Sequence, residues 1–235
     1  MSYTVDLHTH SAYSRGTSKK LTFNNLATWA RFKGIDVLAT GDFTHPSWFT
    51  EIKEQLKEEE SGLLEYGNIK FILGTEINCS AEQNGKKRRT HILVFAPTID
   101  LAFRVTKAFD QYGRLERDGR PTLRMTPKAL LKLVLDIDQR CFIIPAHLWT
   151  PYFGLYGSKS GYDSLEECFE EMTGYVYGIE TGLSSDPAMN WAVPSLDHVS
   201  LMSFSDAHSL QNLGREATVL PGIPSYQGIL DAVKF

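Results

Sequence analysis

The sequence lacks the features that mark secreted or membrane-bound chains. Its 235 residues include only three cysteines, Cys79, Cys141 and Cys168, which are odd in number and widely spaced. They form neither a disulfide framework nor a CxxC zinc module, which points to a reducing compartment. No apolar run approaches the ~18 residues of a membrane span, and the first residues do not resemble a signal peptide. The sequence therefore predicts a cytoplasmic chain without a membrane partner.

An overall positive charge is also missing. The formal net charge is −4, whereas a dedicated nucleic-acid-binding domain is usually basic throughout. Two basic stretches run against this balance, Lys86–Arg89 and the four arginines at positions 114, 117, 120 and 124. Such runs are typical of solvated loops. Charge alone therefore argues mildly against a nucleic-acid partner.

The chain contains no internal repeat, low-complexity segment or flexible linker, so one domain over residues 1–235 is expected. Short apolar runs rich in β-branched residues alternate with helical patterns, and the runs are apolar on both faces, as buried parallel strands are. Expected strands cover residues 3–8, 36–40, 70–76, 91–95, 141–146, 176–180, 200–205 and 217–220. Expected helices cover 23–33, 128–139, 164–172 and 225–233. This alternation predicts an α/β barrel or a doubly wound sheet. Because the last residues fall within a helical pattern, we expect a piece of a longer protein.

Histidines and acidic residues gather at the ends of these expected strands. They are His8, His10, His91, His147 and His208, with Asp42, Glu76, Glu180 and Asp206. Catalytic groups of α/β barrels lie where the carboxyl ends of the strands converge. Residues two apart on a strand point to the same side, so His8 and His10 form one pair, and Asp206 and His208 another. Because imidazole and carboxylate are ligands of Zn, Mn and Fe ions, the pattern predicts a multinuclear metal site. His91 differs, since it is expected to begin its strand.

Each of these residues has a structural alternative. Asp42 and Asp206 could cap helices, and Glu76 could belong to a buried ion pair. A lone histidine is usually a core or surface residue, which is the interpretation kept for His198, while His45 stays open. All the alternatives would have to hold on successive strands, so the metal site is favoured.

The motifs resemble those of the polymerase and histidinol phosphatase (PHP) superfamily, in order and over nearly the whole chain. Asp6–His10 resembles the first motif, and Thr40–Asp42 resembles the second, with Asp42 where many members carry histidine. The later motifs correspond to Gly74–Glu76, His91, Pro145–His147 and Ser205–His208. The resemblance implies a distorted seven-stranded (β/α) TIM-like barrel and a metal-dependent phosphoesterase with a trinuclear site.

The same resemblance implies a set of ligands. The first ion would be held by His8, His10, Glu76 and Asp206. Glu76 would bridge to a second ion held by His91 and His147, and a third ion would lie at Asp42 and His208. A histidine that usually follows the first motif is replaced by Tyr13–Gly16, which leaves the third site incomplete. Two or three ions are expected, Zn²⁺ first and Mn²⁺ or Mg²⁺ as alternatives, with Glu76, Asp206 and His208 as the catalytic side chains.

Within the superfamily, the sequence is similar to the endonuclease Q subfamily, through residues 7–14, 18–19, 30–34, 40–42, 179–187 and 205–209. That resemblance implies DNA as partner and nicking on the 5′ side of deaminated bases, such as hypoxanthine and uracil, or of abasic sites. Complete members continue into a zinc module and a helical region that this chain lacks, and a replication-clamp partner would depend on that missing part. The alternatives are a small-molecule phosphatase acting on histidinol phosphate or a nucleotide, and a non-catalytic structural domain. The full set of ligands argues against the last.

Candidate substrate contacts flank the ligands. Arg15, Lys19 and Lys20 follow the first motif and could clamp phosphates or lie in a solvated loop. The loop of residues 149–157 directly follows His147, and its Trp149, Phe153 and Tyr156 could stack on a base extruded from the duplex. The alternative for this loop is a hydrophobic lid. Glu180 is expected either to support a ligand or to contact the base.

Overall fold

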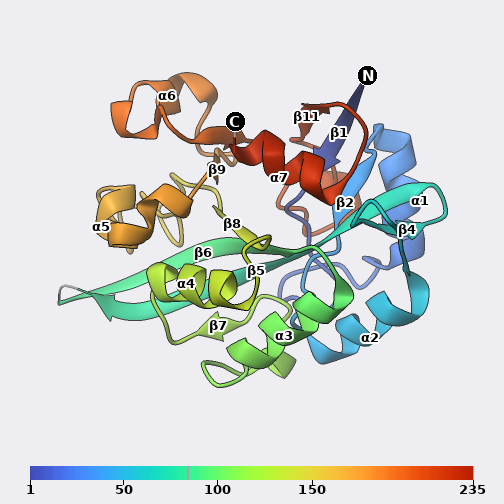
Figure 1. Cartoon of the computed structure of the whole chain (residues 1–235), viewed down its shortest axis with the longest axis horizontal. Helices are drawn as coiled ribbons and strands as arrows, with labels where there is room; N and C mark the ends of the chain where they lie inside the picture. Colours follow the sequence, from blue (N-terminus) through green and yellow to red (C-terminus); the bar gives the residue numbers. More distant parts are fainter. Residues whose placement is uncertain (84, 235) are drawn as a thin grey trace.

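The computed structural model describes residues 1–83 and 85–234, which form a mixed α/β fold (Figure 1). Its strands are β1 (Ser2–Asp6), β2 (Val37–Ala39), β3 (Lys57–Glu58), β4 (Leu64–Tyr66), β5 (Ile69–Gln83), β6 (Lys86–Ala96), β7 (Thr122–Leu123), β8 (Phe142–Pro145), β9 (Gly178–Glu180), β10 (Ser200–Met202) and β11 (Thr218–Pro221). Its α-helices are α1 (Phe23–Lys33), α2 (Pro46–Gln55), α3 (Ile99–Phe109), α4 (Pro127–Ile137), α5 (Leu165–Phe169), α6 (Pro187–Trp191) and α7 (Tyr226–Lys234). Short 3-10 turns lie at Leu115–Arg117, Glu170–Tyr175, Pro194–Leu196 and Leu210–Asn212.

The centre of the larger sheet is parallel. β1 pairs with β2, and β2 pairs with β5, each in parallel register, with Val5 opposite Val37 and Val37 opposite Lys70. α1 connects β1 to β2, because parallel strands need a crossover connection that is usually a helix. α1 begins and ends at the predicted residues, and Gly34 caps it at φ 71°, a conformation that glycine adopts without strain. Because the strands are parallel, their carboxyl ends face the same edge of the sheet.

The longest feature of the sheet is an antiparallel hairpin of β5 and β6, which projects to the left in Figure 1. The sequence predicted two short strands here, at 70–76 and 91–95. Both strands instead continue toward the hairpin tip, because buried residues still alternate beyond the apolar runs, at Cys79, Arg88 and Thr90. Two expectations are therefore corrected. Lys86–Arg89 is part of β6 and not a loop, and His91 lies in the middle of β6 and not at its beginning.

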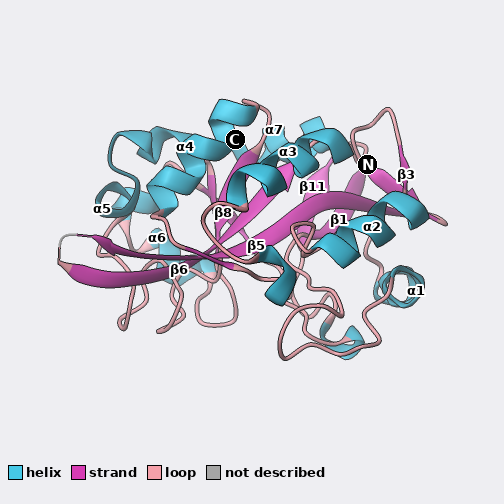
Figure 2. Cartoon of the chain, turned by 90° about the horizontal axis from the view of Figure 1, so that it is seen from below, coloured by secondary structure: helices cyan, strands magenta, loops and turns pink. Residues whose placement is uncertain are grey.

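The predicted α/β class is confirmed, while the seven-stranded barrel stays a prediction. β6 is antiparallel to both β5 and β8, and β9 and β10 form a separate two-stranded parallel sheet. In the described ranges, strand pairing does not close a ring. Figure 2 shows several helices along one side of the strands and a group of long loops on the other. Helices α2 and α3 were missed, although the buried residues of α3, Leu101, Ala102, Val105 and Phe109, lie at helical spacing. No helix in residues 1–83 or 85–234 is long and apolar enough to cross a membrane.

Candidate metal centre

The predicted ligands meet at the carboxyl ends of the strands. His8 and His10 follow β1, His147 follows β8, and Asp206 and His208 follow β10. A parallel β-bridge between Thr9 and Ala207 joins the two histidine-containing pairs side by side. Residues nearly 200 positions apart are thereby brought into one site.

Four side chains form a first cluster. His8, His10, Glu76 and Asp206 each offer one ligand atom, and these atoms lie within 4.8 Å of one another. Asp206 Oδ1 is 3.3 Å from Nε2 of His8 and 3.2 Å from Nε2 of His10. Glu76 Oε2 is 3.5 and 3.3 Å from the same two nitrogens. Two imidazoles and two carboxylates around one point suit a divalent transition-metal ion.

Glu76 also belongs to a second cluster, with His91 and His147. Its other oxygen, Oε1, lies 2.6 Å from His91 Nδ1 and 3.3 Å from His147 Nε2. The two imidazole nitrogens are 3.2 Å apart. Glu76 is buried to 1% exposure between the clusters, with one oxygen directed to each. A carboxylate in this position can bridge two ions.

The ring of His8 is fixed by a hydrogen bond on the side that faces away from the first cluster. Its Nδ1–H donates to the carboxylate of Glu180, with the two oxygens 3.1 and 3.0 Å away. Glu180 is fully buried, and it also accepts the backbone N–H of His147 at 2.6 Å. Nε2 of His8 is left facing the cluster, and in the described part of the chain it has no hydrogen-bond partner. A buried imidazole that is fixed through one nitrogen and free at the other is typical of a metal ligand. In this position Glu180 supports His8, and its burial keeps it from a substrate base.

Asp42 plays a comparable part for His10. Its Oδ1 accepts from Nδ1–H of His10 at 3.1 Å. Its Oδ2 accepts the N–H and hydroxyl of Ser11, at 2.7 and 2.6 Å, and the hydroxyl of Ser14 at 2.8 Å. Both oxygens are thus engaged by protein donors.

The two residues expected at a third ion, Asp42 and His208, border the first cluster, each next to His10. Among the described residues, the possible ligand groups include neither Asp42 nor His208. The His208 ring instead packs edge-on against His10, with centroids 4.7 Å apart. Its Nδ1 lies 2.9 Å from the backbone oxygen of Asp206.

Three of the predicted ligands have a strained backbone. Asp42, His147 and Asp206 have φ angles of 49°, 31° and 46°. Side-chain-bearing residues rarely adopt this region, at a cost on the order of 1–3 kcal/mol each. Each of the three follows a strand, and its side chain lies in or beside a ligand cluster. Such strain is characteristic of functional sites.

The carboxylates shift the proton affinities of the buried histidines. Burial disfavours charge on His8, but Glu180, Asp206 and Glu76 outweigh it and raise its pKa well above 6.5. The pKa of His10 is raised in the same way, against burial, by Asp42, Asp206 and Glu76. Burial lowers the pKa of His91 to about 4, so its ring is neutral at neutral pH despite Glu76. Burial would raise the pKa of Glu76, but the surrounding histidines hold it well below 4.5.

The aromatic loop after His147 packs mostly onto the protein. Phe153 stacks on the ring of His91, with centroids 4.6 Å apart and an angle of 15°, and its backbone oxygen accepts the N–H of His91 at 2.8 Å. Trp149 donates to Asn190 at 2.9 Å, and the hydroxyl of Tyr156 is buried. Three predicted base contacts are therefore partly or largely covered in this conformation. The side chains that reach solvent near them are Tyr152 at 60% exposure, Leu183 at 59% and Trp191 at 69%.

Basic residues lie at the edge of the centre. Arg15 pairs with Asp118 at 3.5 Å, and Lys19 donates to the backbone oxygen of Ala12, while Lys20 is exposed. Arg120 reaches further in, and its Nη1 donates to Glu76 Oε2 at 3.3 Å. The sequence pointed to the basic stretch that contains Arg120, but spacing alone did not connect it to the ligands.

Comparisons with known proteins agree with this geometry. No family model matches the chain. The uncharacterised protein YqxK of Bacillus subtilis is 31% identical over 230 residues, which cover 90% of this chain and 56% of YqxK. The uncharacterised protein MJ0043 of Methanocaldococcus jannaschii is 32% identical over 148 residues, or 63% of this chain and 16% of that protein.

Solved structures extend the likeness to the whole chain. The lesion-specific endonuclease PfuEndoQ of Pyrococcus furiosus superposes on 100% of the chain, with a TM-score of 0.89 and 31% identity. A structure of endonuclease Q with a 27-mer duplex carrying an abasic lesion gives the same TM-score at 32% identity. A proposed metal-dependent phosphoesterase of Bifidobacterium adolescentis shares the fold alone, with a TM-score of 0.55 and 14% identity. The chain spans about half the length of the endonuclease Q structures, 56% and 57%.

Proposed function

We propose that this chain, a relative of endonuclease Q in the PHP superfamily, is a metal-dependent hydrolase that cuts phosphodiester bonds in DNA at damaged bases. The observation that carries the proposal is the pair of ligand clusters that share Glu76. The likeness to endonuclease Q over the full chain supports DNA as the substrate. Deaminated bases and abasic sites are the proposed lesions, with the nick on their 5′ side.

The donors of the two clusters fit divalent metal ions. Nε2 of His8, which faces the first cluster, is buried without a hydrogen-bond partner among the described residues. Without a metal ion, the raised pKa values of His8 and His10 keep protons on these rings beside the two carboxylates, and a divalent ion would take the place of those protons. We propose that His8, His10, Glu76 and Asp206 hold one ion and that Glu76, His91 and His147 hold a second. Zn²⁺ suits this imidazole-rich set, with Mn²⁺ or Mg²⁺ as alternatives.

The bound ions would activate water and offset charge on the phosphate during hydrolysis. The protein's own part is to keep the ligands in place and to admit the substrate. Glu180 and Asp42 fix the rings of His8 and His10, and Phe153 fixes that of His91. Asp206 is 30% exposed, so it faces both the buried histidines and an incoming phosphate. Arg120 supplies a fixed positive charge beside Glu76.

Selection of a damaged base requires that the base leave the stack. Tyr152 follows His147, and Leu183 and Trp191, the last residue of α6, follow Glu180; all three are strongly exposed apolar side chains. We propose that these side chains, and not the packed Trp149 and Tyr156, contact the opened duplex. The exposed Lys86, Lys87 and Arg89, near the tip of the projecting hairpin, would add contacts to the backbone.

Residues 1–235 would form one catalytic domain with the distorted seven-stranded barrel of the superfamily. The relatives are longer, so additional DNA contacts and a replication-clamp partner would come from parts outside this sequence.

A nicking assay tests the proposal. Labelled duplexes carrying one deoxyinosine, one uracil, one abasic site or none are incubated with the protein and Zn²⁺, Mn²⁺ or Mg²⁺. We expect a single nick 5′ to the lesion and none in the undamaged duplex, and no nick with Asp206→Ala. Turnover of histidinol phosphate without any nick would instead assign the chain to the small-molecule phosphatases.

A further inference from the structure

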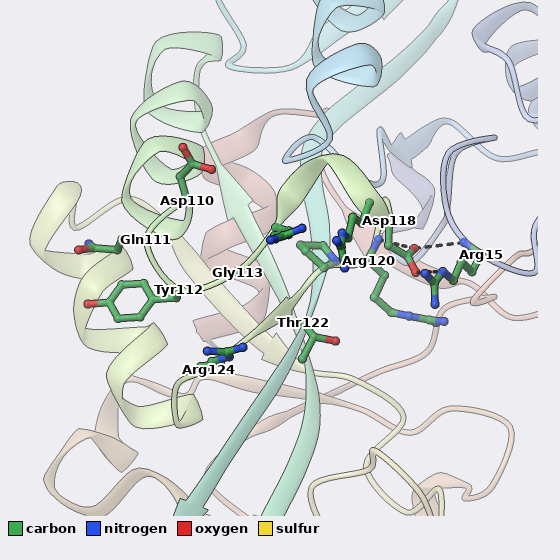
Figure 3. A pocket seen from close by; sticks show the side chains of 12 residues that line it. Arg15, Asp110, Gln111, Tyr112, Gly113, Asp118, Arg120, Thr122 and Arg124 are labelled. Atoms are coloured by element: carbon green, nitrogen blue, oxygen red, sulfur yellow. Dashed lines mark hydrogen bonds and ion pairs between the residues drawn. The ribbon is translucent and has the colours of Figure 1, made fainter.

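A cavity lined by arginines adjoins the metal centre. It has a volume of about 920 Å³, and five arginines line it: Arg15, Arg114, Arg117, Arg120 and Arg124. We call it the arginine pocket. Figure 3 shows Arg15 at its right and Arg124 at its lower left, with Arg120 and Thr122 between them. Five arginines around one cavity are notable in a chain whose net charge is −4.

Most of this positive charge is free. Asp110 and Asp118 are the acidic residues of the lining. Asp118 is already used, since it pairs with the side chain of Arg15 and accepts the backbone N–H groups of Arg15 and Arg120. Within residues 1–83 and 85–234, Arg114, Arg117 and Arg124 form no ion pair. The pocket therefore presents unneutralised guanidinium groups to solvent.

Arg120 links the pocket to the clusters. Its side chain is 22% exposed, and Nη1 lies 3.3 Å from Oε2 of Glu76. The contacts with Asp118 hold the segment of Arg120 against that of Arg15, directly after the first motif. A ligand in the pocket would thus extend to Glu76 and the metal centre, where phosphoester hydrolysis is proposed.

We infer that the arginine pocket binds the sugar-phosphate backbone of the nucleic-acid strand that enters the metal centre. This inference rests on the proposed function. Guanidinium groups bind phosphate oxygens through paired hydrogen bonds and stay charged at any physiological pH. Arg15 lies in the loop after β1, and the other four arginines lie within residues 114–124, which include the turn at Leu115–Arg117 and β7. Exposed arginines distributed in this way match a row of phosphates better than a single small anion.

The experiment compares two triple variants of the 235-residue protein. One is R114A/R117A/R124A, which removes the arginines without ion pairs. The control is R31A/K33A/K132A, which removes three exposed cations on α1 and α4, outside the pocket. Fluorescence anisotropy in EDTA measures binding to a labelled duplex with an abasic-site analogue over a series of KCl concentrations. Thermal melting checks that both variants are folded.

For the pocket variant we expect affinity at least tenfold weaker than wild type, and a slope of log K against log [KCl] that is lower by about three, one for each lost phosphate contact. The control should keep the wild-type slope and nicking rate. Equal losses in the two triple variants would overturn the inference, and so would an unchanged slope in the pocket variant.

Two further results separate this inference from the proposed function. If the wild type nicks the lesion duplex and the pocket variant binds it as well as wild type does, only the pocket assignment fails. If the wild type neither binds nor nicks DNA but hydrolyses bis(p-nitrophenyl) phosphate, DNA is the wrong substrate and both fail. A loss of deoxyadenosine monophosphate binding as large as the loss of duplex binding, with an unchanged slope, would assign the pocket to a small anion instead.

Discussion

The imidazole of His8 is held by the carboxylate of Glu180, 172 positions later in the chain, through Nδ1 at 3.0 and 3.1 Å. The same carboxylate accepts the backbone N–H of His147. One buried side chain thus orients a residue of each ligand cluster. The buried carboxylate leaves Nε2 of His8 as the nitrogen that faces the cluster.

This relationship predicts the effect of Glu180→Gln. The amide has one acceptor oxygen in place of two and carries no negative charge. The side chain at position 180 can therefore no longer accept hydrogen bonds from both His8 and His147 as the carboxylate does. We expect metal affinity to fall by about 10- to 100-fold, as for other supports of metal-ligating histidines. Competition with a chromogenic chelator measures it, with the exposed Glu171→Gln as control. Wild-type affinity in Glu180→Gln would show that the hydrogen bond has no role in metal binding.

Gly119 is predicted to be essential to the support of His10. A Cβ at this position would lie 2.3 Å from Oδ2 of Asp42 and 2.5 Å from the hydroxyl of Ser14. Gly119→Ala should therefore push Asp42 away from His10, destabilise the fold by roughly 1–3 kcal/mol and reduce activity. Gly174→Ala is the matched control, because a Cβ there meets nothing within 4 Å. Urea denaturation measures the free energies of unfolding, and equal values for the two variants would contradict the prediction.

The chain is expected to bind two metal ions. Asp42 is occupied by Ser11, Ser14 and His10, and among the described residues neither it nor His208 belongs to a ligand group. Elemental analysis after dialysis should give two ions per wild-type chain, fewer in His147→Ala, and still two in His208→Ala. Three ions per chain, falling to two in His208→Ala, would restore the third site that the family resemblance implies.

The stability of the metal-free protein and its affinity for metal should depend on pH in opposite ways. The pKa values of His8 and His10 are raised above 6.5, since nearby carboxylates outweigh burial. Charge on these rings stabilises the metal-free protein fully below pH 6.5, and this contribution is lost as pH rises through the raised pKa values. The Tm in EDTA should therefore fall from neutral to alkaline pH. Metal ions displace the same protons, so metal affinity should rise over that range. A metal-free Tm that rises toward alkaline pH would be inconsistent with these shifts.

The exposed aromatic side chains should matter for damaged DNA. Tyr152 and Trp191 are 60% and 69% exposed, so replacing them leaves the core intact. If each stacks on a base, Tyr152→Ala or Trp191→Ala should weaken binding of the lesion duplex by roughly 1–3 kcal/mol. Phe32→Ala, which removes an 80% exposed aromatic on α1, is the control. Anisotropy titrations distinguish the variants, and a loss in Phe32→Ala as large as that in Trp191→Ala would argue against specific stacking.

Much of the fold class and of the ligand set could be predicted because both depend on local pattern. The apolar runs that became β2 and β8 are short and continuous, and candidate site residues follow these strands and β1 within a few positions. β6 was predicted too short because its outer half is basic in sequence, which hides the alternation of buried and exposed residues. Arg88 illustrates the reason, since its buried side chain lies over the ring of Tyr162, 4.6 Å from the centroid, and pairs with Glu167. These partners lie on a distant segment, so Lys86–Arg89 was indistinguishable from a solvated run.

The sequence by itself determined the kind of chemistry, because histidines and carboxylates such as His8, His10 and Asp206 follow successive strands, where they can share metal ions. Only the tertiary structure decided how those ligands are shared and supported. It directed one oxygen of Glu76 to each cluster, engaged Asp42 with protein donors and brought Arg120 to the centre. Each of these outcomes depends on contacts between segments far apart in the chain. Local periodicity carries no information on such contacts, because it reports which face of an element is buried and not what lies against it.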